Sequence, residues 1–517
     1  MPDHDLQSDA ARDAVQLHAH PLWPLDVEQV ARGERAVRLH PDGLATLERA
    51  QRALAHALGN DTAIYGVNTG FGSLARKRVD PGELATVQHN LLRSHAAGVG
   101  EPLPKDVVRA MMLLLAASLT RGHSGVRPEL VRLIVDLLNK DVTPVVPSIG
   151  SVGASGDLAP LAHLALVLIG EGEATDAQGT TMAGGEALYR AGLVPVSLGP
   201  KEGLALINGT HLMAARAALL MCDTTRVFDA AVAATAMSID AARATDSFLD
   251  PRVYEARNHW GPARIADRLR AMIAGSEILT SHTENDPRVQ DPYSLRCATY
   301  VLGAALATID SVREAVNAEL GAVTDNPLVF AGEGDDEAAV ISAGNFHGMP
   351  IALPLDQLTL AFTHIAGIAE RRVFIHLAAA DPQNPLHPHL SVRPGVESGL
   401  MITQYTAAAC VNELITLSTP ATVSNIPTCA GMEDYNSFGP RAAAKAAQAL
   451  ERCADVVAIE LLVGAEAIEY QRPLKSGAGV ERTHTVIRER VPKLTTDRTP
   501  APDIRALREL IFAGRFR

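Results

Sequence analysis

Ala154, Ser155 and Gly156 form a tripeptide whose small residues would allow the backbone to close on itself. The nitrogen of Gly156 would attack the carbonyl carbon of Ala154, and the missing Cβ at position 156 leaves that approach open. Loss of water from the ring and from the Ser155 hydroxyl would leave an exocyclic methylene on an imidazolone. None of the twenty side chains supplies so strong an electrophile, so this tripeptide is a candidate reactive centre.

An ordinary turn is the competing interpretation of the same residues. Gly and Ser are typical of turns, and Asp157 stands where it could cap a helix over the apolar run that follows it. Pro147 and Pro160 favour cyclisation instead, because they would stiffen the segment and compress the loop. The tetrapeptide by itself leaves both interpretations open.

Three other kinds of reactive site fit the sequence poorly. A serine hydrolase needs Gly-x-Ser-x-Gly, whereas Gly follows Ser155 directly. The glycines near residue 70 do not form a dinucleotide-binding Gly-x-Gly-x-x-Gly motif, and no Walker motif is present. Two close histidine pairs, near residues 19 and 388, lack helical spacing and nearby Cys partners. We therefore interpret those histidines as loop residues and expect no metal.

Blocks along the whole chain strengthen the first interpretation. They occur in the order YGVNTGFG (65–72), LLRSHAAGVG (91–100), GSVGASGDLAPLAH (150–163), KEGLALINGT (201–210), VQDPYSLRC (289–297), TDNPLV (324–329), SAGNFHG (342–348) and MEDYNSFG (432–439). On these blocks the chain resembles the aromatic amino acid ammonia-lyases, which carry a 4-methylideneimidazole-5-one (MIO) group. The resemblance implies that Ala154-Ser155-Gly156 forms the MIO and that no dissociable cofactor is needed.

The resemblance also implies a set of catalytic residues. Tyr65 resembles the base that removes the substrate β-proton, which requires a pKa well below the usual value of about 10. Asn208, Gln290 and Tyr293 resemble residues that line the ring and hold the substrate or the MIO carbonyl. Arg296 resembles the arginine that binds the substrate carboxylate, a task that its planar guanidinium suits.

Four further residues concern the choice of substrate. The pair Ser94-His95 is similar to the histidine lyases of this family, and Glu433 matches the glutamate that those enzymes place near the imidazole. Phe346 resembles the aromatic residue near the MIO. A polar imidazole needs hydrogen-bond partners in a dry site, and His95 and Glu433 could provide them. We therefore expect conversion of L-histidine to trans-urocanate and ammonia, a first step of histidine catabolism.

Two runs depart from the family pattern and leave other substrates open. Ala298–Tyr300 stands where the family usually has x-Pro-Gln, and Met432–Tyr435 stands where histidine lyases usually have Gln-Glu-Asp-His. Tyr300 and Tyr435 could reshape the pocket for a histidine derivative such as a betaine, or could lie in an outer shell. A lyase for another aryl amino acid, or a 2,3-aminomutase, would keep the same electrophile.

A protein without enzymatic activity is the remaining alternative. The helical scaffold could persist as an inactive structural or binding protein. The joint presence of Ser155, Tyr65 and Arg296 disfavours that interpretation, because an inactive site has no physical reason to keep them together.

Helical periodicity dominates the elements that must position these residues. Apolar residues recur at helical spacing in four stretches, at 130–138, 301–320, 358–373 and 441–470. We predict a mainly α protein with a loop-rich N-terminal domain (1–225) that carries the tripeptide, and a long helical bundle with a C-terminal helical region (226–517). The resemblance implies a fumarase/aspartase-like superhelical fold and a homotetramer whose active sites are shared between subunits.

The composition of the 517-residue chain excludes several classes of protein. A formal charge of −13 disfavours nucleic acid as a partner. The N-terminus lacks the pattern of a signal peptide, and no uninterrupted apolar run approaches ~18 residues, so we expect no membrane span. Five scattered cysteines without CxxC spacing favour free thiols in a reducing compartment. We expect a cytoplasmic protein that acts on a small molecule.

Overall fold

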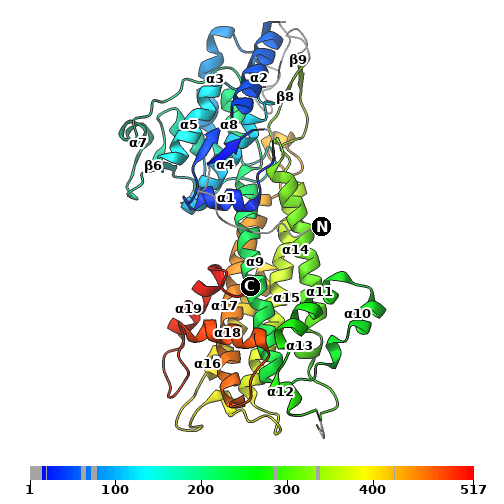
Figure 1. Cartoon of the computed structure of the whole chain (residues 1–517). Helices are drawn as coiled ribbons and strands as arrows, with labels where there is room; N and C mark the ends of the chain where they lie inside the picture. Colours follow the sequence, from blue (N-terminus) through cyan, green and yellow to red (C-terminus); the bar gives the residue numbers. More distant parts are fainter. Residues whose placement is uncertain are drawn as a thin grey trace. The chain divides into compact units, whose positions relative to one another are not determined.

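The structure is a computed structural model, and it describes residues 14–517 except 19, 60–63, 65, 71–77, 284–285, 287, 333–337 and 424. Helices dominate the chain in Figure 1, and the strands between them are short. The prediction of a mainly α protein is therefore confirmed.

Contacts divide the chain into two compact units, each assembled from three segments. Unit 1 comprises Met1–Leu219, Glu314–Leu355 and Ala421–Ala444, and unit 2 comprises Leu220–Arg313, Asp356–Pro420 and Lys445–Arg517. Four helices contain the boundaries between these segments: α9 (His211–Ala241), α14 (Ala298–Leu320), α15 (Met349–Ala378) and α17 (Gly439–Gln471). The predicted division at residue 225 falls inside α9, and it stays a prediction.

Unit 1 contains eight further helices and the strands of the described residues. The helices are α1 (Pro24–Ala31), α2 (Pro41–Gly59), α3 (Leu84–His95), α4 (Lys105–Thr120), α5 (Pro128–Asn139), α6 (Leu158–Leu168), α7 (Gly184–Arg190) and α8 (Glu202–Ile207). The strands pair as β1 (Val15–Leu17) with β2 (Val37–Leu39), β3 (Val99–Pro102) with β5 (Pro147–Ile149), β4 (Thr143–Pro144) with β6 (Glu173–Thr175) and β7 (Thr181–Ala183), and β8 (Leu328–Ala331) with β9 (Ala338–Ile341).

The core of unit 1 follows from the apolar pattern of α4 and α5. The predicted helical stripe at 130–138 lies in α5, where every leucine and isoleucine is buried and Pro128 occupies the first turn. Every residue of α4 from Val107 to Thr120 is buried. The apolar run 111–117 is thus part of a buried helix.

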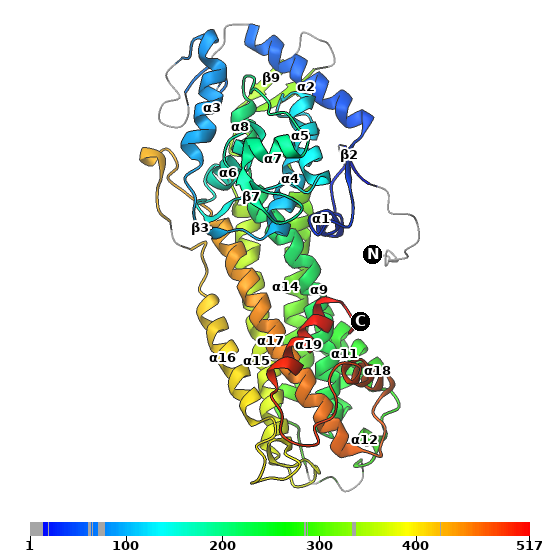
Figure 2. The ribbon, with the colours of Figure 1, turned by 90° about the vertical axis from the view of Figure 1, so that its left-hand side faces the viewer.

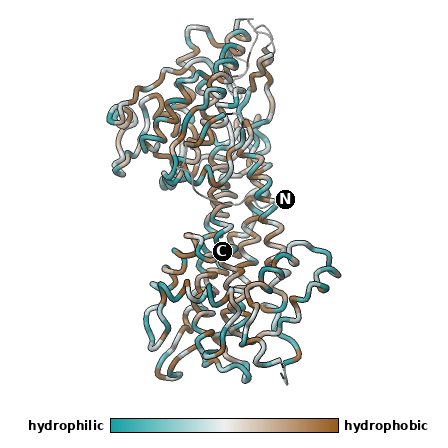
Figure 3. The backbone as a smooth tube through the Cα atoms, viewed as in Figure 1, coloured by the Kyte–Doolittle hydropathy of each residue, from teal (hydrophilic) through white to brown (hydrophobic). Residues whose placement is uncertain are grey.

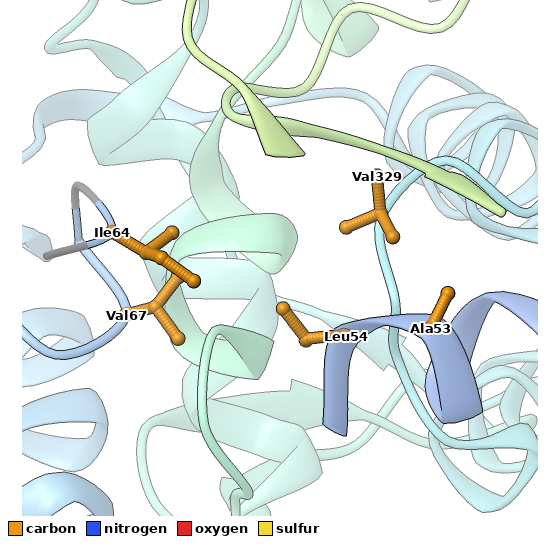
Figure 4. Packing of buried hydrophobic residues seen from close by; sticks show 5 residues of the cluster. All are labelled: Ala53, Leu54, Ile64, Val67 and Val329. Atoms are coloured by element: carbon orange, nitrogen blue, oxygen red, sulfur yellow. The ribbon is translucent and has the colours of Figure 1, made fainter. Parts of the chain in front are cut away.

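A second apolar cluster surrounds the chain near residues 64–67. Ile64 and Val67 pack with Ala53 and Leu54 of α2 and with Val329 of β8 (Figure 4). β8 and β9 form an antiparallel hairpin, and the backbone N–H of Val329 donates to the carbonyl of His123. The chain on either side of position 65 is therefore fixed by packing against α2 and β8.

Unit 2 is built from long helices. Besides its parts of α9, α14, α15 and α17, it contains α10 (Pro251–Arg257), α11 (Trp260–Ile273), α12 (Glu277–Thr280), α13 (Tyr293–Arg296), α16 (Met401–Leu417), α18 (Ala478–Arg488) and α19 (Ala501–Phe512). Figure 2 shows α15, α16 and α17 running alongside one another.

A buried ion pair lies at the centre of this bundle. Arg372 of α15 donates to Glu460 of α17 at 2.6 and 2.9 Å, and both side chains are fully buried. Ser238 of α9 donates to the same carboxylate at 2.7 Å. The predicted apolar stripe of α15, at 358–373, is buried around this pair. A buried pair whose partners are all present fixes how the helices pack, because loss of one partner would leave an unpaired charge.

α15 is the described helix whose length and apolar character would suit a membrane span. Its most apolar window has a mean hydropathy of 1.3, and 56% of that window is buried by other parts of the chain. Figure 3 shows hydrophobic and hydrophilic residues alternating along the helices of both units. The core helix of a folded protein has the same properties, so α15 is weak support for a membrane protein.

Candidate functional site

A cavity of about 980 Å³ in unit 1 brings together residues that are far apart in the sequence. Its walls come from α3, from the loop before α6, from the end of α8 and from the segments 342–347 and 429–435. Seven of the predicted site residues line it: Ser94, His95, Ala154, Ser155, Asn208, Phe346 and Glu433.

The backbone at Gly156 lies directly against Gly209. Gly156 has a φ of +77°, and a Cβ there would lie 2.2 Å from the Gly209 carbonyl oxygen. The next amide, of Asp157, donates to that oxygen at 2.7 Å. Position 156 therefore requires glycine both for its left-handed conformation and for this close approach.

The other side of the loop is held by the segment before α17. Ser437 donates from its hydroxyl to the Gly153 carbonyl at 3.0 Å, and the Phe438 amide donates to the Val152 carbonyl at 2.9 Å. Ser155 thus stands between two anchored stretches of backbone.

Asp157 caps a different helix from the one that the turn interpretation predicted. It stands at the N-terminus of α6, but its carboxyl accepts from the amides of Leu212 and Met213 in α9, at 2.8 and 3.2 Å. Ser151 donates to the same carboxyl at 3.0 Å. Burial raises the pKa of Asp157 to about 7, although these three hydrogen bonds oppose the shift. Asp157 therefore ties the Ser155 loop to the start of α9.

Asn208 contacts the backbone of the tripeptide itself. Its amide nitrogen donates to the Ser155 carbonyl at 2.8 Å. Its Oδ1 is buried and has no hydrogen-bond partner among the described residues. A buried amide oxygen without a partner is open to a donor from a bound ligand or water.

Glu433 also lines the cavity, and its carboxyl group contacts Ser155. The Ser155 hydroxyl donates to Oε1 at 2.9 Å, and the Thr428 hydroxyl donates to Oε2 at 2.7 Å. Backbone hydrogen bonds between Thr428 and Glu433 close the short loop that presents the carboxyl group. The position of Glu433 is therefore set by its own loop as well as by Ser155.

His95 is the last residue of α3, and its ring is oriented by that helix. Nδ1 lies 2.9 Å from the Leu91 carbonyl, and a carbonyl can only accept, so Nδ1 carries the proton. Burial lowers the pKa of His95, and the Leu91 carbonyl and Glu433 oppose this shift only in part. The imidazole is thus neutral near pH 7, with Nε2 as a hydrogen-bond acceptor.

The cavity also contains residues that sequence reasoning did not assign. Asn326 and His347 lie within blocks that resemble the family, but no role was predicted for them. Cys429 lines the cavity as a free thiol. Met432 and Tyr435, which depart from the family pattern, line it too, so Tyr435 is part of the cavity wall. The blocks pointed to these segments, but no residue spacing distinguished the residues that face inward.

Gln290, Tyr293 and Arg296 lie in unit 2 and do not line the cavity. Arg296 donates to Gln290 Oε1 and to the Asp291 carbonyl, both at 2.9 Å. Its guanidinium stands 4.5 Å from the centre of the Tyr293 ring, and Tyr293 is 70% exposed. The three residues therefore form a surface cluster of their own.

Thr299 and Tyr300, the other departure from the family pattern, also lie in unit 2. Thr299 is buried and accepts a hydrogen bond from the Tyr254 hydroxyl at 2.9 Å. Tyr300 stacks on Tyr254, and Arg257 lies 5.1 Å from the Tyr300 ring centre. Both residues have local packing partners, and neither lines the cavity of unit 1.

Tyr65, the predicted base, lies outside the residues that the structure describes. Its neighbours Ile64 and Val67 belong to the cluster under β8, and Gly70 lines the cavity.

Known proteins are similar to this chain along nearly its whole length. A family model described as aromatic amino acid lyase matches residues 22–489. Histidine ammonia-lyase from Myxococcus xanthus (strain DK1622) is 45% identical over 512 residues, which are 98% of each chain. The crystal structure of histidine ammonia-lyase from Trypanosoma cruzi has a TM-score of 0.89 at 34% identity, over 97% of this chain and 94% of that one. Tyrosine aminomutase from Streptomyces globisporus has a TM-score of 0.90 at 32% identity, over 97% of both chains.

Proposed function

Since this chain belongs to the aromatic amino acid lyase family and is a carbon–nitrogen lyase, we propose that it eliminates ammonia from L-histidine and releases trans-urocanate. This membership confirms the resemblance and the fold class predicted from the sequence blocks. The histidine ammonia-lyases among its relatives support the choice of substrate and a place at the start of histidine breakdown.

The observation that carries the proposal is that His95 and Glu433 line the same cavity as Ser155. Both groups present hydrogen-bond acceptors to the cavity, namely the Nε2 of a neutral imidazole and a carboxyl group. The imidazole ring of a histidine substrate has one N–H donor for such acceptors when neutral and two when protonated, whereas a phenyl ring has none. Burying these acceptors against a phenyl ring would leave them unpaired, which costs roughly 1–3 kcal/mol for each group.

Ala154, Ser155 and Gly156 fit the formation of MIO. Gly156 offers its backbone without a Cβ, and Asn208 donates to the Ser155 carbonyl, which stays as the ring carbonyl after cyclisation. The MIO would supply an electrophilic methylene, and attachment of the substrate amine there would make the amine a better leaving group. A donor on the ring carbonyl stabilises negative charge that develops there, which is the contribution we propose for Asn208.

Loss of the Ser155 hydroxyl has a consequence for Glu433. That hydroxyl is the partner of Oε1, so the dehydrated residue no longer fills this acceptor. Oε2 keeps its hydrogen bond from Thr428, which holds the carboxyl group in place. Maturation would thereby open one oxygen of Glu433 for the substrate imidazole.

We propose that the remaining predicted residues complete the reaction. Tyr65 takes the β-proton as the Cα–N bond breaks, and Arg296 binds the substrate carboxylate, with Gln290 and Tyr293 beside it. Phe346 contributes an aromatic wall to the cavity.

We further propose a cytoplasmic homotetramer whose subunits share active sites. Unit 2 exposes large apolar side chains on α15 and α16, which is typical of an association surface. They are Leu360, Phe374, Ile402, Tyr405 and Ile415. The exposed cluster of Arg296 would then serve the cavity of a neighbouring copy.

The test is turnover by the purified protein. Incubation with L-histidine should produce the near-ultraviolet absorbance of trans-urocanate, and Glu433→Leu should lower kcat/KM for histidine by at least about a hundredfold. Turnover of phenylalanine, tyrosine or a histidine betaine without turnover of histidine would overturn the substrate.

The similarity to an aminomutase gives the same assay a second readout. An aminomutase returns the released ammonia to the β-carbon and would accumulate a β-amino acid. Chiral chromatography would detect that β-amino acid. The proposed lyase should instead release free ammonia in a one-to-one ratio with urocanate.

A further inference from the structure

The segment 96–98, between His95 and β3, contacts α6. The amide of Gly98 donates to Nε2 of His163 at 3.0 Å. A Cβ at Gly98 would lie 3.1 Å from Pro147 Cβ and 3.2 Å from His163 Nε2, so the backbone touches the imidazole directly. Only two residues separate Gly98 from His95 in the sequence.

The same part of unit 1 carries the reactive tripeptide. A Cβ at Gly150 would lie 3.1 Å from both Gly98 Cα and Ala159 Cβ, so the start of the Ser155 loop touches the 96–98 segment as well as α6. The loop that begins at Gly150 ends at Asp157, and α6 follows at once. The His163 hydrogen bond therefore joins the chain that presents His95 to the helix that follows Ser155.

We propose that His163 is a positioning residue, which sets the distance between the substrate-selecting imidazole of His95 and the electrophile formed at Ser155. The proposal rests on the proposed function and adds a residue that acts through another one. His163 does not line the cavity, so it has no contact with the substrate.

A second connection between the same elements is weaker. Arg93 of α3 donates to Glu171, which follows α6, at 2.6 to 3.2 Å. The two side chains are 53% and 37% exposed, and ion pairs open to solvent contribute little to stability. The hydrogen bond from the Gly98 backbone to the half-buried His163 is thus the better shielded of the two links.

Only the neutral imidazole can accept the Gly98 hydrogen bond. A protonated ring carries N–H donors on both nitrogens, so its Nε2–H would point at the N–H of Gly98 and no hydrogen bond could form. Burial lowers the pKa of His163 and favours the neutral form. The ionisable groups that line the hollow around the ring are Arg93, Glu171 and Glu173.

Two variants of the full-length protein test the proposal. His163→Leu removes the acceptor, so KM for L-histidine should rise about tenfold while kcat changes less than about threefold. The two-water mass deficit of the MIO should persist. His163→Gln keeps an acceptor of similar reach and should return KM to within about threefold of the wild type. His89→Leu, at a half-buried histidine of α3 that does not line the cavity, is the matched control and should leave KM unchanged.

The pH profile separates positioning from a general loss of structure. In the wild type, KM should rise as the pH falls through the lowered pKa of His163, because protonation removes the acceptor. His163→Gln has no imidazole at position 163, so it should lack the part of the KM increase that comes from protonation of His163. Titration of His95 and of the substrate affects both proteins equally. Equal acid limbs in the two proteins would overturn the proposal.

Hydrogen exchange gives a readout that needs no substrate. The amide of Gly98 should exchange at least tenfold faster in His163→Leu than in the wild type. An unchanged rate, an unchanged KM, a His163→Gln variant as impaired as His163→Leu, or loss of the mass deficit would each overturn the proposal. If the wild type does not turn over histidine, the proposed function fails, and the exchange rate alone decides the role of His163.

Discussion

At residue 156, cyclisation and packing both require glycine. Cyclisation needs an unhindered nitrogen, and the contact with Gly209 leaves no space for a Cβ. The sequence suggested the first requirement, because a Gly in a candidate cyclising tripeptide is informative. It could not suggest the second, because Gly209 is distant in sequence and nothing in the spacing places it against Gly156.

Gly156→Ala is expected to abolish both cyclisation and activity. The methyl group would stand 2.2 Å from the Gly209 carbonyl oxygen, and alanine at a φ of +77° is strained. Intact mass spectrometry should show no loss of two waters, and urocanate formation should fall by at least about a thousandfold.

Gly179→Ala is the matched control for this variant. Gly179 has a φ of +81°, but a Cβ there would meet nothing within 4 Å. It should keep the mass deficit and the activity, because it introduces similar backbone strain without a clash. A mass deficit of two waters in Gly156→Ala would contradict the role of this contact.

At the scale of the elements, Asp157 links the reactive loop to α9. Its carboxyl accepts from two amides at the first turn of that helix, where a side-chain acceptor is worth about 1 kcal/mol. Asp157→Ala should therefore lower the melting temperature by a few degrees, whereas Asp157→Asn keeps an acceptor and should lower it less.

The pH dependence of stability follows from the pKa of about 7. This pKa lies above the ordinary value of 3.8. As the pH rises from about 4 to 7, the unfolded chain therefore loses the Asp157 proton while the folded chain still keeps it. The contribution to stability is complete below about pH 4 and is lost as the pH rises through 7. Melting temperatures from pH 4 to 8 should fall less steeply for Asp157→Asn than for the wild type, and parallel curves would contradict this origin.

The elements differ in how far the sequence could predict them. The long stripes of α5 and α15 repeat over several turns, and a periodic pattern of that length identifies a helix and its buried face. β3 has four residues and β5 has three, and none of them is fully buried, so no alternation marks these strands. Their pairing depends on contacts between residues about 50 positions apart, and only a structure shows such contacts.

At the scale of the whole molecule, the predicted site residues are divided between two units. Ser94, His95, Asn208 and Glu433 share the cavity of unit 1, as expected of residues that act together. Arg296 lies in unit 2 with Gln290 and Tyr293. Sequence blocks can name the members of a site, but they carry no information on which copy of the chain supplies each member.

Complementation between inactive variants tests the sharing of sites. Ser155→Ala and Arg296→Leu should each be inactive alone. If neighbouring copies supply the two residues, co-expressed and mixed tetramers should regain up to about a quarter of wild-type activity, because random assembly leaves that share of sites intact. If one chain supplies both residues, no site is intact and no activity returns.

The assembly itself provides the control. Light scattering should give a mass about four times the 54.7 kDa of the chain for the wild type and for both variants. A monomeric wild type would contradict the shared site, whatever the outcome of the mixing experiment.

The hydrogen bond from Asn208 to the Ser155 carbonyl joins two residues 53 positions apart. Neither this contact nor the approach of Gly209 to Gly156 exists in a chain that is still being synthesised or has misfolded. Such a chain would hold an ordinary peptide at Ser155 and could not attack or be attacked by cellular amines and thiols. The enzyme would thus become reactive only after it has folded. The fraction of molecules that lack two waters would then measure the fraction that has folded correctly.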